Sequence, residues 1–275
     1  MHDNNTHSFM CTSNWPLLQS SCKQPQQGLA LSHPFYEKIA QYLSQDYAVV
    51  YIVENNTTQV VRNLSKMGLA VEDFIENGIL TIIDADSFYS PLQTKLDYKI
   101  LLTQWQKIVS SVSKNGKFKR VILMGMPHQA FFESKENQKK LVEYEEEAAK
   151  CHDGSFQVFC CYTKELIDKL PLSHLIRLVI AHQNIVSSNS NNDNQEAIVS
   201  RIVDIVEEGL TKALGSETSI LVLKTLRLIY KIDKGDIKSN PELFEEKLKR
   251  IIGEEVAGLV LKIIADRIKD EIVFY

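Results

Sequence analysis

Two adjacent cysteines stand out among the residues that could do redox or metal chemistry. They lie in the segment VFCCYTKELI, where Cys160 and Cys161 end an apolar run just ahead of a predicted helix. Neighbours on a strand point to opposite faces of its sheet, so these two thiols cannot chelate one metal together. Cys151 and His152 come shortly before them, but the spacing lacks the CxxC turn of structural zinc sites. We therefore interpret both cysteines as packing residues and predict no metal site.

Catalytic groups of the common kinds are missing from the sequence. No GxSxG nucleophile motif occurs, and His128, His174 and His182 do not have the HExxH spacing of a metalloprotease helix. A lone histidine near a helix is more often a hydrogen-bonded structural residue than a ligand or a base, although its near-neutral titration permits a switch role. The sequence thus indicates no catalytic residue.

Phosphate binding is not indicated either. After the apolar run AVVYIVE the chain continues NNTTQ, with no glycine and no lysine, where a phosphate-binding turn would need glycines. Neither GxxxxGK[ST] nor GxGxxG occurs anywhere in the chain. Asn55, Asn56, Thr57 and Thr58 are instead suited to capping the helix that follows. We predict no cofactor, and neither tight binding nor hydrolysis of ATP.

An alternation of strands and helices must position these residues. Short apolar or β-branched runs at 48–54, 78–86, 118–127 and 156–162 are separated by stretches with helical spacing. Strands that alternate with helices of this length are typical of βαβ units, with a parallel sheet covered on both faces. The nearly all-apolar strands agree with that burial. The predicted fold class of this part of the chain is therefore α/β.

Composition divides the chain into four segments. Residues 1–27 are rich in Asn, Gln and Ser and are predicted to be a disordered tail. The α/β pattern occupies 28–186, and SSNSNNDN at 187–194 is typical of a linker. Residues 195–275 have helical periodicity only and are predicted to form a small all-α domain.

The whole-chain composition is that of a globular protein, with 44% apolar residues, 24% charged residues and a net charge of −4. No apolar run reaches the ~18 residues that span a bilayer, and the N-terminus has no signal-peptide pattern. We therefore expect a cytoplasmic location and no membrane partner. The odd count of five cysteines agrees with a reducing compartment and no structural disulfides.

The predicted helical domain carries 13 basic and 15 acidic residues, a net charge of −2. Lys224, Arg227 and Lys231 form a basic stripe that could contact phosphates, but such stripes are usually a solvated helix face. No helix-turn-helix pattern is evident, so DNA is a weaker candidate than a protein partner. The apolar segments GLVLKII and SILVLKTL favour a homodimer that forms through these helices.

Six segments together resemble a known family. They are, in chain order, AVVYIVE, GILTIIDADSFY, RVILMGMP, YEEEAAK, FCCYTKELI and LIRLVIAHQNI. With them, the region 28–186 resembles the MEDS domain, the methanogen/methylotroph DcmR-type sensory domain. The resemblance implies a RecA/KaiC-like core without a phosphate-binding loop, and a role in sensing small molecules such as hydrocarbon derivatives. The family opens with a histidine-containing strand, whereas a proline follows His33 here, so no role is carried over to His33.

The C-terminal segment that begins LGSETSILVLKTL is similar to a small helical output domain found in ammonia-oxidising archaea. Together the two resemblances imply a one-component signalling protein that acts in transcription regulation. The sensor and the output would then lie in one chain.

A small-molecule site is predicted beyond the carboxyl ends of the strands, where open α/β sheets bind their ligands. Tyr89 and Tyr162 follow strands that end on this edge, and a tyrosine supplies an apolar ring with one polar handle. The family resemblance adds Trp105 and His182 from adjoining helices, and Glu145 completes the predicted set. The predicted ligand is small and mostly apolar.

Other functions fit the same sequence. An enzyme could use this cleft with Glu145, Tyr162 and His182 as acid–base groups, and a scaffold could leave it empty. Tyr89 and Tyr162 would in that last case only cover the end of the sheet. A mostly apolar, aromatic cleft would favour the sensor, whereas convergent carboxylates or histidines with shifted pKa values would favour the enzyme.

Overall fold

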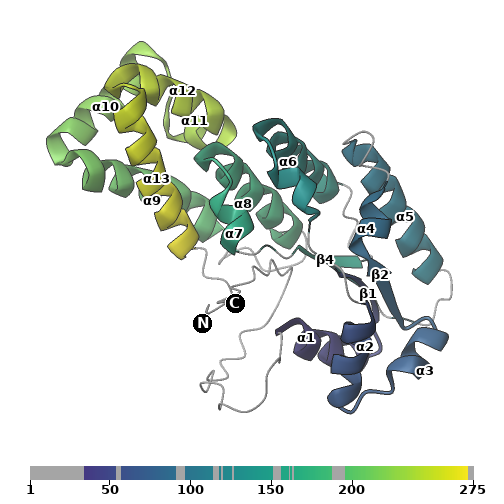
Figure 1. Ribbon diagram of the computed structural model, residues 1–275. Coiled ribbons are helices and arrows are strands. Elements are labelled where there is room, and N and C mark those ends of the chain that lie inside the picture. Colours follow the sequence, from purple (N-terminus) through teal and green to yellow (C-terminus); the bar gives the residue numbers. More distant parts are fainter. Residues whose placement is uncertain are drawn as a thin grey trace. The chain divides into compact units, whose positions relative to one another are not determined.

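A four-stranded parallel sheet is the centre of the N-terminal half of the chain (Figure 1). The computed structural model describes residues 34–53, 57–90, 97–113, 118, 120–125, 127–150, 156–160, 162, 164–187 and 196–271. The strands are β1 (Ala48–Val53), β2 (Leu80–Asp84), β3 (Val121–Gly125) and β4 (Phe156–Cys160). Their order across the sheet is β2-β1-β3-β4, and all three neighbouring pairs are parallel. The predicted α/β class is confirmed.

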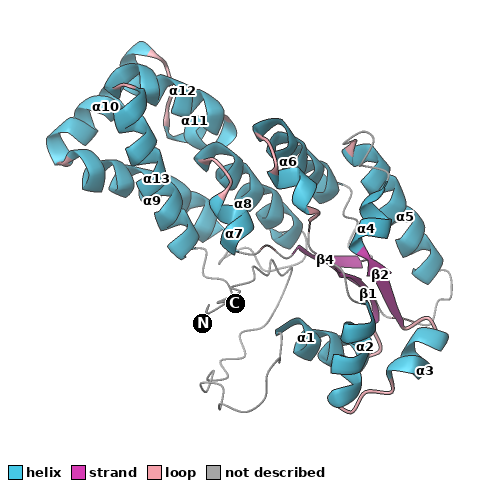
Figure 2. Cartoon of the chain, viewed as in Figure 1, coloured by secondary structure: helices cyan, strands magenta, loops and turns pink. Residues whose placement is uncertain are grey.

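Helices cover both faces of this sheet (Figure 2). They are α1 (Pro34–Leu43), α2 (Thr57–Lys66), α3 (Val71–Glu76), α4 (Ala85–Tyr89) and α5 (Tyr98–Ser113), with a 3-10 turn, η2 (Gln129–Phe132), after β3. Alternation along β1 places Val49 and Tyr51 in the cluster with α1–α3, and Ala48 and Val50 in the cluster with α5. Because both faces are buried, the strands are apolar at nearly every position.

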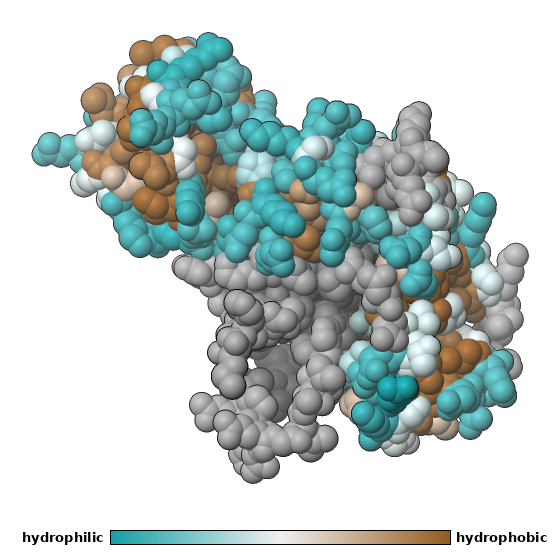
Figure 3. Space-filling model, in the orientation of Figure 1, coloured by the Kyte–Doolittle hydropathy of each residue, from teal (hydrophilic) through white to brown (hydrophobic). Residues whose placement is uncertain are grey.

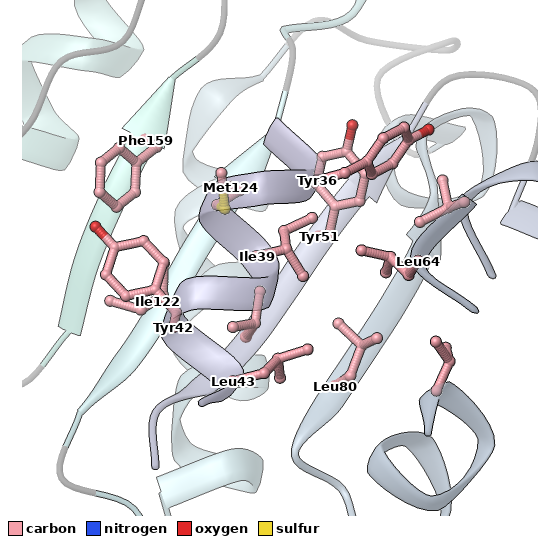
Figure 4. Close-up of a cluster of buried hydrophobic side chains, with 13 residues drawn as sticks. Tyr36, Ile39, Tyr42, Leu43, Tyr51, Leu64, Leu80, Ile122, Met124 and Phe159 are labelled. Atoms are coloured by element: carbon pink, nitrogen blue, oxygen red, sulfur yellow. The ribbon is translucent and has the colours of Figure 1, made fainter. Parts of the chain in front are cut away.

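The larger core cluster lies between the sheet and α1–α3 and contains several aromatic rings (Figure 4). The ring of Tyr42 on α1 lies 5.6 Å from the ring of Tyr47 and 5.6 Å from that of Phe159 on β4. Burial raises the pKa of the Tyr42 hydroxyl well above its usual range. These contacts tie the first described helix to the edge strand of the sheet.

By packing, the described chain divides into two compact units. The sheet unit contains the described residues of Met10–Phe131 and Cys151–Tyr162, and the helical unit contains those of Phe132–Lys150 and Thr163–Tyr275. Within the helical unit, α8 packs against α6 and also against α12 and α13. Its helices are α6 (Lys135–Lys150), α7 (Lys164–Asp168), α8 (Leu172–Ser187), α9 (Glu196–Leu214), α10 (Ser216–Ile229), α11 (Lys234–Ser239), α12 (Pro241–Ile252) and α13 (Glu254–Glu271).

Local capping sets the ends of the C-terminal helices. Asn240 caps α12 by accepting a hydrogen bond from the Leu243 N–H at 3.2 Å, and Pro241 occupies the first helical position, as its fixed φ favours. Gly253 ends α12 with a φ of 83°, a conformation open to glycine at little cost. Asp233 and Asp236 form a capping box at the start of α11. Short polar signals therefore delimit the helices predicted from periodicity.

Some predictions fall where the structure gives no description. The tail 1–27 lies outside the described residues, and so does the predicted linker 187–194 apart from its first residue, which ends α8. Both stay predictions. The predicted strand 78–86 is shorter, because Asp84 caps α4 by accepting a hydrogen bond from the Ser87 N–H at 3.0 Å. Among the described residues no helix is both long and apolar enough to cross a membrane.

Candidate functional site

The order of the strands points to one edge of the sheet as the place for a ligand. Successive crossovers go from β1 to β2 on one side and then past β1 to β3 on the other, so the direction of winding reverses between β1 and β3. Ligands of open α/β sheets bind beyond the carboxyl ends of the strands at such a reversal. At this edge β2 leads directly into α4, and β3 leads through Pro127 and His128 into η2.

Aromatic side chains gather beyond β2 and β3. The ring of Phe88 lies 4.9 Å from the ring of Tyr89 and 4.9 Å from that of Trp105 on α5. Tyr89 in turn lies 5.4 Å from the His128 ring and 6.4 Å from the Phe131 ring. These centroid separations are those of favourable aromatic pairs. We call these five residues the edge cluster.

One polar group of the edge cluster is His128, whose orientation is fixed by the backbone. Its Nδ1 accepts a hydrogen bond from the Ala130 N–H at 3.2 Å, so the ring proton of the neutral imidazole lies on Nε2. Nε2 lies 3.6 Å from Oδ1 of Asp86 on α4. The side chains of His128 and Asp86 are 21% and 62% exposed, so a donor N–H and a carboxylate stand beside buried rings.

The edge cluster therefore combines apolar rings with an oriented hydrogen-bond donor. Phe88, Tyr89 and Phe131 are at most 4% exposed, so their apolar rings form the interior of the cluster, and His128, whose side chain is 21% exposed, can donate one hydrogen bond through its Nε2–H. This combination suits a small apolar molecule that has one acceptor group.

The structure groups some of the predicted site residues and separates others. Tyr89 and Trp105 meet through Phe88 in the edge cluster. Tyr162 lies in the same unit, two positions after the last residue of β4. Tyr89 and Tyr162 are 4% and 2% exposed, so neither ring stands at an open rim.

The cysteine segment is described only in part. Cys160 is the last residue of β4 and is half-buried, on the same face of the strand as Val158. Cys161, Cys151 and His152 lie outside the described residues. The interpretation of the two adjacent cysteines as packing residues therefore stays a prediction.

The other two predicted residues, Glu145 and His182, belong to the helical unit. They are buried on α6 and α8, with His182 Nε2 3.7 Å from Glu145 Oε2. His182 Nδ1 lies 2.8 Å from the Leu178 carbonyl oxygen, which can only accept, so Nδ1 carries a proton. Glu145 and His182 therefore form a buried pair between α6 and α8.

Helix α8 is also held by charged residues of α12. Oε1 of Glu245 accepts a hydrogen bond from the Ser173 N–H at 2.6 Å, in the first turn of α8, where an anion is favoured by the orphan N–H groups. Burial raises the pKa of Glu245, and the bond from Ser173 opposes that shift. A residue from beyond the predicted linker thus completes the start of α8.

A second contact between the same helices is made by Arg177. Its guanidinium donates to both carboxylate oxygens of Glu146 on α6, at 2.8 and 2.6 Å, and to Glu242 on α12 at 2.8 Å. These hydrogen bonds, first of all those to Glu146, raise the pKa of Arg177 well above its usual range. The planar guanidinium suits this forked geometry. Three helices are joined through one side chain.

Sequence reasoning missed His128 and Phe131, as well as Phe88, as members of the site, and it missed Arg177. The available signal for the first two was position, because MPHQAFF follows a strand directly at the carboxyl edge. Arg177 gave no signal, since its partners Glu146 and Glu242 lie 31 and 65 positions away.

Comparison with known proteins gives one match. Residues 30–183, more than half of the chain, match the model of the family described as MEDS, the methanogen/methylotroph DcmR sensory domain. No curated protein and no solved structure gave a match. The matched segment contains the whole sheet unit as described from α1 onward, and also α6, α7 and most of α8 from the helical unit.

Proposed function

Since this chain belongs to the MEDS sensory-domain family, we propose that it is a sensor that binds a small, mostly apolar molecule and passes the signal to its C-terminal helices. The ligand would bind at the carboxyl edge of the sheet. The observation that carries this proposal is the edge cluster, in which a chain of aromatic ring contacts leads to the oriented Nε2–H donor of His128.

Helix α8 supports the second half of the proposal. It lies largely within the family match, yet Glu245 and Glu242 of α12 bind its Ser173 and Arg177. A shift of α8 would have to break or move these contacts, because the groups that bind it are fixed on another helix. The C-terminal helices would thus receive the signal, and their net charge of −2 favours a protein as the receiver over DNA.

A thermal-shift screen tests the binding. The full chain is heated with a panel of small alcohols, aldehydes and ketones of increasing hydrocarbon length. A bound molecule raises the melting temperature by mass action. We expect a rise for members that combine an apolar body with one acceptor, and no rise with ATP and Mg²⁺.

Variants then locate the binding site. Tyr89→Ala and His128→Phe should abolish the rise caused by the best member of the panel. Ile100→Ala is the matched control, because Ile100 is 37% exposed on α5, the helix that carries Trp105, and lies outside the edge cluster. An unchanged rise in both site variants, with all three proteins folded by circular dichroism, would contradict the proposed site.

A further inference from the structure

Exposed apolar residues are concentrated on two helices of the helical unit. Nine large hydrophobic side chains are exposed among the described residues, and six of them lie on α10 and α13. Figure 3 shows hydrophobic residues gathered over these C-terminal helices. The other three, Met67, Ile75 and Ile100, lie singly in the sheet unit. Exposed apolar residues gathered on one helix face are typical of an interaction surface. The six are Ile220, Leu221, Leu228, Ile229, Val256 and Leu259.

The face on α10 is apolar and carries two opposite charges, Glu217 and Lys224, seven residues apart on its exposed side. Leu221 and Leu228 are each 65% exposed and are seven residues apart, so they lie on the same side of the helix. Lys224 lies between them on that side, one turn from each. The buried residues Val222 and Leu226 lie on the opposite side. Within the described residues no ion pair engages Lys224.

The face on the first turns of α13 is apolar and also carries two opposite charges, Glu255 and Lys262, seven residues apart on its exposed side. Val256 and Leu259 are exposed there, and Glu255 stands one turn before Leu259. Glu255 has no ion-pair partner among the described residues. The two faces are therefore both apolar, and when the two helices pack antiparallel, Lys224 faces Glu255 and Glu217 faces Lys262.

Gly258 marks the same face of α13. A Cβ at Gly258 would meet nothing within 4 Å, whereas one at Gly209 on α9 would lie 2.6 Å from Ile264 Cγ1. Packing inside the chain thus explains Gly209 but not Gly258, although a glycine within a helix is destabilising relative to alanine. A glycine between exposed apolar residues lets another helix approach the backbone closely.

We propose that these two faces join two copies of the chain, with α10 of one copy packed on the start of α13 of the other. In a two-fold dimer the contact forms twice, because each copy carries both faces. Leu221 and Leu228 would then pack beside Gly258 and Leu259 of the partner copy, and Lys224 would pair with Glu255. The dimer requires no ligand, so it can be tested apart from the sensor proposal.

Sedimentation velocity of the full chain over a concentration series tests the dimer. The unmodified chain should sediment as a dimer, and Leu221→Glu with Leu228→Glu should give a monomer with unchanged circular dichroism. Ile75→Glu with Ile100→Glu is the matched control, since it places the same charges at exposed apolar positions of the sheet unit. This control should remain dimeric.

A charge exchange tests the proposed register and does not rely on the leucine variants. Lys224→Glu alone and Glu255→Lys alone should each weaken the dimer about tenfold or more, because like charges then face each other. The two changes combined should restore the original dissociation constant. The proposal is overturned by a monomer at every soluble concentration, by a dimer that survives the leucine variants, or by a combined charge variant that stays as weak as the single ones.

Discussion

The sheet unit and the helical unit are held together in different ways. In the sheet unit, apolar and aromatic side chains fill both faces of a parallel sheet. Both units are assembled from separate stretches of the chain, but in the helical unit charged residues of α12 bind the start and first turns of α8. The family match therefore ends inside a compact unit. Its last helices are supported by the segment that follows the match.

The largest test of this comparison uses one buried phenylalanine in each unit. Phe159 in the sheet unit is 1% exposed and Phe244 in the helical unit is fully buried. Truncating either to alanine should cost about 3–5 kcal/mol, because it removes packing and leaves a cavity. By differential scanning calorimetry, Phe159→Ala should lower one unfolding transition and Phe244→Ala the other. A single transition that both variants shift alike would show that the two units do not unfold separately.

The next test concerns Arg177. Arg177→Ala leaves Glu146 and Glu242 without their shared donor, and we expect a loss of about 1–3 kcal/mol in the free energy of unfolding by urea. The matched control is Arg250→Ala, whose pair with Glu246 is solvent-exposed on both sides and should contribute less than about 0.5 kcal/mol. Equal losses in the two variants would mean that Arg177 is an ordinary surface residue.

Two glycines of the helical unit should respond oppositely to the same substitution. Gly209→Ala places a methyl group against Ile264 and should destabilise the chain by about 1–3 kcal/mol. Gly258→Ala meets no neighbour and should stabilise the helix by about 0.5–1 kcal/mol through helix propensity. Urea unfolding at a dilution where the chain is monomeric measures both. Equal signs would contradict the packing described for α9 and α13.

The smallest effect is the pH dependence from His174 on α8. Burial lowers its pKa below 6.5, and Arg177, Lys139 and Lys135 lower it further, against the opposing charge of Glu242. The unfolded chain then binds more protons below pH 6.5, so stability falls as the pH drops from 6.5 toward the folded-state pKa.

His174→Leu should reduce this loss of stability. The measurement is the difference in unfolding free energy between about pH 7.5 and about pH 5.5 for both proteins. The variant should show a smaller difference than the original chain. An identical pH dependence in the two proteins would exclude His174 as its source.

The sequence predicted the sheet well because its strands are continuous apolar runs bounded by polar segments. The predicted end of the second strand was too late. Asp84 and Asp86 are the same residue type two positions apart, and only the N-cap hydrogen bond of Asp84 shows that α4 begins directly after Asp84. The edge cluster was half predicted. Tyr89 could be predicted because it follows a recognisable strand, whereas the role of His128 depends on a backbone hydrogen bond from Ala130, which the sequence does not show.

The contacts between α8 and α12 could not be predicted. Glutamates such as Glu242 and Glu245 resemble any solvated residues on a helix, and nothing in their spacing reveals a partner in another helix. Polar linker composition also suggested a separation of domains at 187–194. Helix α8 packs against helices that lie on both sides of that segment in the sequence. Such packing depends on the tertiary fold and cannot be predicted from local composition.

Amide hydrogen exchange of the full-length Arg177→Ala variant tests most directly whether α8 links the family segment to the C-terminal helices. The account predicts faster exchange in both α8 and α12, because one side chain ties them together, and unchanged exchange in β1 and β3 of the sheet unit. Faster exchange in α8 alone, with α12 unchanged, would contradict the link.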